Sequence, residues 1–463
     1  MARIDSKENA PRKEASRRLR ILVLASFCDP EAVSMPYVTY SHAAALGKMH
    51  EVTLVVGGPS ERNVRRANGP FSSIEVVRIK KLEKLNAWVF RKILKSNFDT
   101  QVLTALMYPS SLAFEWYAWR KLRKRIRGGE FDVVLRLLPM SPVIGSPFAY
   151  FLRSRTVPFV IGPLNGGLPW PTGFSQLGNQ KEWISGLRSC YRYLPFSRST
   201  YRRATAIIAA SSQTYSEFAK YGNKIFFIPE PGIDSSLCFG DTRTSEPGAK
   251  CQMLFVGGLV PRKACDLALC AAAPFLRRGL AYFTVVGDGS ERARLEGLAL
   301  SLGISDAVKF CGWLSHAEVL KHMRTADVFV FPTLRDNGAG VVFEALATGS
   351  VPVVADFGGP GDIVYPDVGF KVPLTNENDF VLQLQEVLAQ VVGDRKLLEG
   401  LRQQGMAYAQ ERLTWDAKAK ETTKVLEWAL RRGTKPNLQP PKQLVLQCYK
   451  NPNDAESAGC VEP

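Results

Sequence analysis

The chain has 463 residues, of which 46% are hydrophobic and 22% are charged. This length is several times what one hydrophobic core usually organises, so two domains of roughly 200 residues each are expected and a small single module is excluded. The composition is that of a globular protein, which excludes collagen-like, low-complexity and mostly disordered chains.

The net charge of +17 comes from the first half of the chain. Residues 1–230 carry 35 basic and 16 acidic side chains, a net of +19, whereas residues 231–463 have a net charge of −2. A basic first half suits an anionic partner such as a membrane surface. A nucleic-acid partner is a less favoured alternative, because the sequence contains no nucleic-acid-binding motif.

Cysteines and apolar segments indicate the compartment. The nine cysteines are odd in number and form no C-x-x-C pair, so neither a disulfide framework nor a zinc site is expected. The apolar run at residues 21–27 is too short for the hydrophobic region of a secretory signal. The run at residues 133–152 is broken by Arg136 and three prolines, so it is not a membrane-spanning helix. These patterns predict a cytoplasmic protein.

Strand-like and helix-like segments alternate along the first half. Residues 20–26 form a continuous apolar run, typical of a strand that is buried on both faces of a parallel sheet, and a helix-like segment follows at 37–48. This alternation predicts an α/β fold. Further strands are expected at residues 50–58, 131–138, 157–162, 205–211 and 224–232.

The same alternation restarts after a polar segment at residues 235–250, which is the expected linker between two domains. A second parallel sheet is therefore predicted. Its strands are expected at residues 251–258, 281–289, 308–313, 326–332 and 351–359, with helices near 265–277, 291–302 and 339–348.

A glycine-rich loop with two cations follows the first strand of the second half. Gly257 and Gly258 end the strand, and the loop then brings Arg262 and Lys263 to the start of a helix. Glycines let the backbone approach a diphosphate, a helix start offers unpaired N–H groups, and an ammonium group neutralises phosphate charge. A surface loop with a solvated Lys263 explains this segment equally well when it is taken alone.

The segment PTLRDNGAGVVFEALATG is more specific. Gly338 and Gly340 stand at the head of an apolar helix, and Glu344 lies one turn beyond Gly340 on the same face. Backbone N–H groups at residues 339–341 suit a phosphate, and Glu344 suits vicinal ribose hydroxyl groups. A lone carboxylate in such an apolar helix favours a ligand-facing role over a solvated one, and Asp336 is then placed for the sugar.

These segments resemble the family 4 glycosyltransferases over about residues 20–430. Members show G-R-L-x-x-x-K-G after a strand, and this chain matches at Gly257, Leu259 and Lys263 but has Gly258 instead of arginine and Ala264 instead of glycine. They also show E-x7-E. Here Asp336 and Glu344 have this spacing, with aspartate in the first position. Asp336 begins the run Asp336-Asn337-Gly338-Ala339-Gly340.

The resemblance implies the GT-B architecture, in which two Rossmann-like, doubly wound parallel-sheet domains face a cleft. It places an acceptor domain at residues 19–235, a nucleotide-sugar donor domain at 250–410, a helix that crosses back at 411–432 and a disordered tail at 433–463. It implies Lys263, Asp336 and Glu344 as catalytic residues. The implied donor-binding residues are Gly257, Gly258, Arg262, Lys263, Gly312, Trp313, Leu314, Asp336, Asn337, Gly338, Ala339, Gly340, Val341 and Glu344, with the base against residues 312–314.

The first half matches the family less closely. By resemblance, Asn165, Gly166 and Gly167 lie on the acceptor side, and a tight structural turn is an equally good interpretation of this segment. The first half contains only His42 and His50, so a catalytic histidine is not expected.

No metal and no cofactor beyond a UDP- or GDP-sugar substrate is expected. His316 and His322 have no third ligand nearby, and no Asp-x-Asp motif is present, so both histidines are expected to be surface residues. Gly287 and Gly289 form a lone G-x-G that lacks the third glycine and the ribose-binding acid of a dinucleotide site.

The sequence therefore predicts a retaining glycosyltransferase that moves a sugar from a nucleoside-diphosphate donor to a hydroxyl group, in polysaccharide or glycoconjugate biosynthesis. Two alternatives stay open besides the nucleic-acid binder. The missing arginine at Gly258 and the aspartate at 336 also suit a catalytically inactive GT-B subunit or regulator. The second alternative is a GT-B epimerase or phosphorylase.

A basic segment predicts the acceptor class. Residues 116–127 contain six cations together with Trp116, Trp119, Leu122 and Ile126, a composition that suits a helix lying on an anionic leaflet. Attachment to the inner face of the membrane would favour a lipid-linked saccharide over a soluble saccharide as the acceptor. A solvated helix face is an equally good interpretation.

Overall fold

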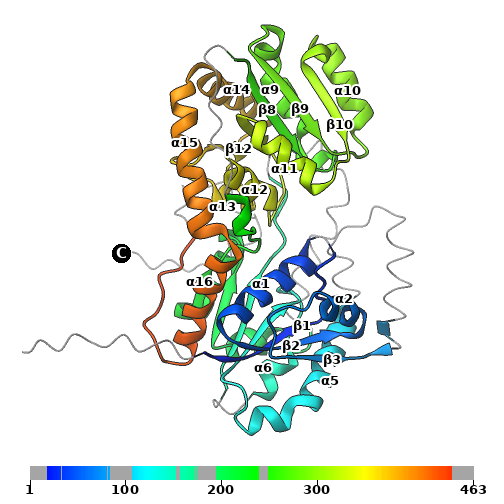
Figure 1. The fold of residues 1–463 in the computed structure, drawn as a ribbon, viewed down its shortest axis with the longest axis vertical. Helices are drawn as coiled ribbons and strands as arrows, with labels where there is room; N and C mark the ends of the chain where they lie inside the picture. Colours follow the sequence, from blue (N-terminus) through cyan, green and yellow to red (C-terminus); the bar gives the residue numbers. More distant parts are fainter. Residues whose placement is uncertain are drawn as a thin grey trace, which may run out of the picture.

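The computed structural model describes residues 18–440, except residues 33, 81, 84–106, 153–156, 172, 175–193 and 239–248. These described residues form two parallel sheets, one after the other along the chain (Figure 1). The N-terminal sheet is blue to cyan and the C-terminal sheet is green to yellow.

The N-terminal sheet has seven strands in the order β3-β2-β1-β4-β5-β6-β7, and every adjacent pair is parallel. The predicted run at residues 20–26 is the central strand β1, whose residues 21–25 are fully buried. The strands are β1 (Arg20–Ala25), β2 (Glu51–Gly57), β3 (Ser73–Val77), β4 (Val133–Leu138), β5 (Phe159–Leu164), β6 (Ala206–Ala209) and β7 (Ile225–Phe227).

Helices cover both faces of this sheet, because each crossover between parallel strands returns over one face or the other. The helices are α1 (Met35–Met49), α2 (Glu61–Arg66), α5 (Tyr108–Arg127), α6 (Pro147–Phe151), α7 (Ser197–Arg203) and α8 (Ser212–Phe218).

The C-terminal sheet has six parallel strands in the order β10-β9-β8-β11-β12-β13. Its strands are β8 (Cys251–Val256), β9 (Ala281–Val286), β10 (Val308–Gly312), β11 (Val328–Phe331), β12 (Val351–Ala355) and β13 (Phe370–Val372). Its helices are α9 (Cys265–Arg277), α10 (Arg292–Ser301), α11 (His316–Thr325), α12 (Gly340–Thr348), α13 (Gly358–Ile363), α14 (Glu377–Gly393) and α15 (Arg395–Tyr408).

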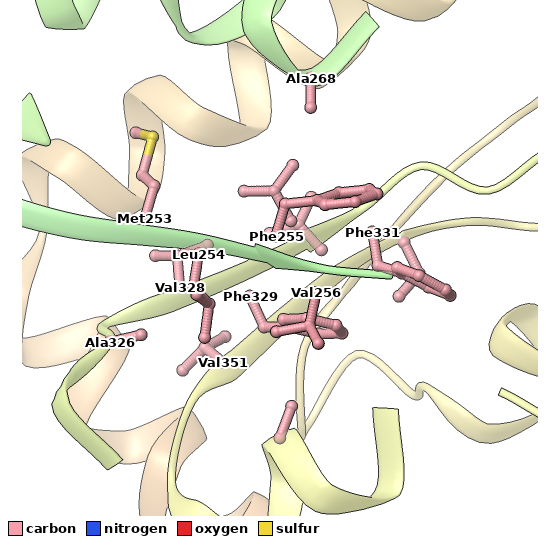
Figure 2. Close-up of a cluster of buried hydrophobic side chains, with 14 of the residues drawn as sticks. Met253, Leu254, Phe255, Val256, Ala268, Ala326, Val328, Phe329, Phe331 and Val351 are labelled. Carbon is pink, nitrogen blue, oxygen red and sulfur yellow. The ribbon is translucent and has the colours of Figure 1, made fainter. Parts of the chain in front are cut away.

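The core of the C-terminal sheet is aromatic at its centre (Figure 2). Phe329 and Phe331 of β11 stack with ring centroids 5.4 Å apart, and Phe255 of β8 lies 6.1 Å from Phe331. All three rings are fully buried. The rigid pair β8 and β11 therefore carries the two loops that begin at Gly257 and Pro332.

The last helix, α16 (Trp415–Ala429), packs on α1 of the N-terminal sheet (Figure 1). His42 Nε2 lies 2.9 Å from Thr422 Oγ1, and His50 Nε2 lies 2.8 Å from Thr423 Oγ1. Both histidines are buried, so they hold the returning helix rather than face a substrate.

The predicted disordered tail needs a correction at its start. Residues 433–440 lie along the edge of the N-terminal sheet, where the Phe227 N–H donates to the Leu438 carbonyl at 2.8 Å. The side chain of Leu438 packs against the core of that sheet, which explains why this part is ordered. Residues 441–463 of the tail and residues 239–248 of the predicted linker lie outside the described residues.

Candidate active site

The glycine-rich loop that carries Arg262 and Lys263 begins where β8 ends. A 3-10 turn at Pro261–Lys263 connects it to α9, and Ala264 adopts a left-handed conformation with φ 50° where the family has glycine. Gly287 and Gly289 pack beneath this loop. A Cβ on Gly287 would lie 2.0 Å from the Gly257 carbonyl oxygen, and one on Gly289 would lie 2.3 Å from that of Leu259. This lone G-x-G therefore supports the loop by close packing.

Lys263 and Asp336 meet at the ends of β8 and β11. Lys263 Nζ forms an ion pair with Asp336 Oδ2, and it also lies 4.6 Å from the centre of the Phe331 ring. Both side chains are largely buried. Burial lowers the pKa of Lys263, although the Asp336 charge opposes this. Burial also opposes ionisation of Asp336, but the charge and hydrogen bond of Lys263, together with the Ala339 N–H and the Arg262 charge, outweigh it and keep the pKa of Asp336 below its usual value.

The loop before α12 is shaped by the glycine turn that follows β12. Ala339 is left-handed, with φ 47°, and its N–H lies 3.3 Å from Asp336 Oδ1. The Gly359 N–H donates to the Asp336 carbonyl at 2.9 Å. A Cβ on Gly359 would lie 2.2 Å from the Asn337 carbonyl oxygen, so the turn must be glycine for the loop to sit this close.

Glu344 lies one turn into α12 and contacts the histidine that begins α11. His316 Nε2 lies 2.9 Å from Glu344 Oε1, and the His316 side chain is 65% exposed. The hydrogen bond to Glu344 raises the pKa of His316. His316 is on the surface, as expected, but the sequence did not reveal its contact with Glu344, because the two residues belong to different helices.

The residues expected to hold the base lie at the end of β10. Gly312 is left-handed, with φ 71°, and its carbonyl accepts a 2.9 Å hydrogen bond from the Gly287 N–H. Trp313 is 79% exposed. This segment is therefore attached to the exit of β9, next to β8 in the sheet.

The loop with Asn165–Gly167, which we call the acceptor loop, follows β5. It contacts the loop at residues 332–339 before α12, which we call the donor loop. The Gly166 N–H donates to Thr214 Oγ1 at 3.0 Å, and the Gly166 carbonyl accepts from Asn337 Nδ2 at 2.9 Å. A second contact between the domains joins the Ser212 N–H to Asp362 Oδ2 at 2.8 Å. The structure thus brings Gly166 into direct contact with Asn337.

Two buried charged residues at this junction were missed by the sequence reasoning. Asn165 Nδ2 donates to Glu230 Oε2, just after β7, and Lys418 Nζ of α16 donates to the Pro229 carbonyl at 2.6 Å. Burial raises the pKa of Glu230 to about 7 and lowers that of Lys418 to about 7. The available signal was a carboxylate in the turn PEPG directly after a strand.

Among the described residues, no helix is long and apolar enough to cross a bilayer, and no group of three or more His, Cys, Asp or Glu side chains could hold a metal ion. A cavity of about 410 Å³ lies between α7, α8 and the turn after α8, and it is lined by none of the predicted site residues.

The two sheets and the returning helix define a GT-B protein. Solved structures share this fold at low sequence identity, including HepE of Anabaena in complex with UDP, with a TM-score of 0.57, 16% identity and coverage of 89% of this chain and 100% of that chain. The lipopolysaccharide glycosyltransferase WaaG gives a TM-score of 0.51, 16% identity and coverage of 88% and 99%. The predicted fold class is confirmed.

Residues 242–405, which include most of the C-terminal domain, match the model of the glycosyl transferases group 1. An uncharacterized glycosyltransferase of Methanocaldococcus jannaschii is 30% identical over 38% of this chain and 45% of its own length. A D-inositol 3-phosphate glycosyltransferase of Geodermatophilus obscurus is 38% identical over 35% and 37%. The matches thus span less than half of these relatives.

Proposed function

We propose that the protein is a retaining glycosyltransferase of family 4 that transfers a sugar from a UDP- or GDP-sugar to a hydroxyl group of a saccharide. The observation that carries this proposal is the ion pair of Lys263 and Asp336 at the ends of β8 and β11, with Glu344 one turn into α12, the helix that follows the Asp336 loop. The names of the relatives support it, since several are glycosyltransferases and two are described as dependent on GDP-mannose. The solved neighbour with bound UDP is consistent with such a donor.

The proposed donor lies along the C-terminal ends of the strands. Its diphosphate contacts the backbone at Gly257 and Gly258, the side chains of Arg262 and Lys263, and the N–H groups at the start of α12, where a helix offers unpaired donors. Glu344 accepts hydrogen bonds from the ribose, and residues 312–314 hold the base. Asp336 and the following loop hold the transferred sugar.

The proposed reaction needs electrostatic stabilisation more than a protein base. The bond between C1 of the sugar and the β-phosphate oxygen breaks, and the acceptor oxygen bonds to C1 on the same face. The acceptor proton passes to a phosphate oxygen, and the nucleoside diphosphate leaves. Charge grows on the β-phosphate during this step, so the buried Lys263 ammonium stabilises the transition state more than the bound donor.

A donor screen tests this function. Thermal unfolding is measured with UDP, GDP and a set of UDP- and GDP-sugars, because a ligand that binds only the folded protein raises the melting temperature. Hydrolysis of the stabilising donor is then followed. The proposal expects stabilisation by one nucleotide class and slow hydrolysis of its sugar. Binding without any hydrolysis would favour the inactive GT-B subunit. No binding of any nucleotide or nucleotide sugar would refute both the glycosyltransferase and the inactive subunit.

The variant Glu344→Ala tests whether Glu344 binds the donor. It should weaken binding of the stabilising donor by about 1.5–3 kcal/mol, since it removes charge-assisted hydrogen bonds to the ribose. Calorimetry measures the change, and Glu386→Ala at an exposed position of α14 is the comparison. An unchanged donor affinity in Glu344→Ala would contradict the role of Glu344.

We also propose that the basic face of α5 rests on an anionic membrane, which would present a lipid-linked saccharide as the acceptor. Trp116 and Tyr117 are exposed on this helix, whereas Trp119 is buried against the sheet. Lys121 and Arg125 are paired with Glu75. Four more cations of α5 are exposed and make no ion pair with a described residue: Arg120, Arg123, Lys124 and Arg127.

Sedimentation with anionic and with neutral liposomes, at low and high salt, tests the membrane contact. Each cation near the surface contributes about 1 kcal/mol, so the four free cations should give binding that salt weakens. Replacing these four residues by glutamine should abolish sedimentation at low salt. A wild-type protein that stays in the supernatant at low salt would leave a soluble saccharide as the acceptor.

A further inference from the structure

Three oxygen atoms lack a hydrogen-bond donor where the acceptor loop meets the donor loop. Asn165 Oδ1 and Asn337 Oδ1 are enclosed and receive no hydrogen bond from the described residues. Glu230 is 6% exposed and receives a hydrogen bond from Asn165 at Oε2. Its Oε1 receives none from a described residue, although it is not fully enclosed as the two amide oxygens are. Buried acceptors of this kind are rare, because each costs the free energy of its lost hydration.

The orientation of both amides is set by the acceptors that their NH2 groups contact. Asn165 Nδ2 donates to the Glu230 carboxylate, and Asn337 Nδ2 donates to the Gly166 carbonyl at 2.9 Å. Rotating either amide by half a turn would place an oxygen against an oxygen. The two Oδ1 atoms are therefore acceptors, and the junction offers acceptors without matching donors.

A purely structural role does not explain the Glu230 carboxylate. The nearby Lys418 ammonium donates to the Pro229 carbonyl and lies 5.3 Å from the centre of the Phe343 ring, and no described residue forms an ion pair with Glu230. Burial of an unpaired carboxylate destabilises the fold. A glutamine would accept the same hydrogen bond from Asn165 at a lower cost.

We propose that Glu230, Asn165 and Asn337 form a binding site for the hydroxyl groups of the acceptor saccharide. This inference rests on the proposed function. Hydroxyl groups are the donors that the three oxygens lack, and a bond from a hydroxyl to a carboxylate is stronger than one between neutral groups. Glu230 and Asn165 belong to the N-terminal domain, opposite the proposed donor, and Asn337 directly follows Asp336.

The acceptor saccharide must separate the two loops to reach this site, since both amide oxygens are enclosed in the donor-free protein. It replaces the Asn337 to Gly166 contact with its own hydroxyl groups. A saccharide bound there lies beside the proposed position of the transferred sugar.

The charge state of Glu230 gives the site a pH dependence. The charged groups that act on it are Asp336, which disfavours its ionisation, and Lys418, which favours it, while Lys263 is paired with Asp336. Burial raises the pKa of Glu230 to about 7. The saccharide should therefore bind more tightly as the pH rises through 7.

The experiment compares the wild type with Glu230→Gln and with Asp234→Asn. Asp234 is a matched control, because it lies four residues further on and accepts a hydrogen bond from the Ser236 N–H. Saturation-transfer NMR measures binding of methyl α-glucoside, methyl α-mannoside and myo-inositol in the presence of UDP or GDP, at pH 6 and pH 8. Calorimetry measures nucleotide affinity, and thermal unfolding measures stability at both pH values.

At least one of the three probes should bind the wild type and the Asp234→Asn protein, more tightly at pH 8 than at pH 6. Glu230→Gln should bind it at least tenfold more weakly at pH 8, with no pH dependence, unchanged nucleotide affinity and no loss of stability at pH 8. Unchanged binding in Glu230→Gln, a loss of stability that accompanies the loss of binding, or no probe binding to the wild type would each overturn the inference. Failure of the wild type to bind either nucleotide would instead refute the proposed function.

Discussion

Lys263 is engaged by Asp336 before any donor arrives, and this contact determines how its loss should appear in experiments. The ammonium group is buried between the Asp336 carboxylate and the Phe331 ring. A second negative charge, on the β-phosphate, can therefore be stabilised without moving the lysine far. The same contact means that removing Lys263 leaves a buried carboxylate unpaired.

Lys263→Ala should lower kcat at least 100-fold, since one preorganised charge that opposes the developing phosphate charge contributes roughly 3–4 kcal/mol to the barrier. Nucleotide affinity should fall less. Steady-state hydrolysis of the donor and calorimetry measure the two effects. Lys250→Ala, at the exposed start of β8, should behave as wild type. Equal losses in kcat and in nucleotide affinity would contradict a role confined to the transition state.

The His316 to Glu344 contact predicts a pH dependence of donor binding. The hydrogen bond to Glu344 raises the pKa of His316 in the donor-free protein. If the ribose takes the Glu344 oxygens, His316 loses its partner and releases a proton above pH 6.5, so donor affinity should rise with pH in that range. Calorimetry in two buffers of different ionisation enthalpy detects the proton. His316→Gln should remove the proton release and His322→Gln should not, and equal release in both variants would refute the competition.

Local sequence predicted most of the strands, and the edge strands β3 and β13 were the exceptions. The run at 20–26 became β1 and the segment near 265–277 became α9, because continuous burial and helical spacing leave strong patterns. β3 and β13 were missed because each is a short edge strand with half-buried residues, so neither has a continuous apolar run.

The glycines that begin α13 position the donor loop through direct backbone contact. In Gly359→Ala the new methyl group would lie 2.2 Å from the Asn337 carbonyl oxygen, so the loop must move. Donor affinity should fall at least tenfold, and stability should fall by about 1–3 kcal/mol, as for overpacked cores. Calorimetry measures donor affinity, and denaturant unfolding measures stability. Gly297→Ala within α10, where a Cβ meets open space, should bind donor normally, and full donor affinity in Gly359→Ala would show that the loop tolerates displacement.

Helix α16, near the C-terminal end of the described chain, packs on α1 of the N-terminal domain. This contact should make the stability of the fold sensitive to acid. His42 is buried against Thr422 of this helix, and burial lowers its pKa to about 3. The unfolded chain binds a proton near pH 6.5 and the folded chain does not, so stability falls as the pH falls from 6.5 towards 3.

Because of this linkage, the wild type should lose roughly 2 kcal/mol between pH 6.5 and pH 5 from His42 alone. His42→Gln can keep a hydrogen bond to Thr422 but does not titrate, so its stability should depend less on pH in this range. Urea unfolding at both pH values measures the difference, with His322→Gln on α11 as the comparison. An identical pH dependence in the wild type and His42→Gln would mean that His42 is not the acid-sensitive group.

The sequence by itself determined the fold class and the donor half of the site, because both depend on residues that are close in the chain. A strand followed by glycines and Lys263, and a helix headed by Gly340 with Glu344 one turn on, are local patterns. Their chemistry can be read without knowing what lies opposite.

Only the tertiary structure decided which groups meet across the chain. It joined Lys263 to Asp336, His316 to Glu344, and Asn165 to Glu230, pairs that are separated by 73, 28 and 65 residues. It also buried Glu230 and Lys418, which as sequence are two ordinary polar residues. Burial and pairing depend on how the sheets and the returning helix pack, and no local pattern encodes that packing, so the burial of Glu230 beside Asn165 became visible only in the folded protein.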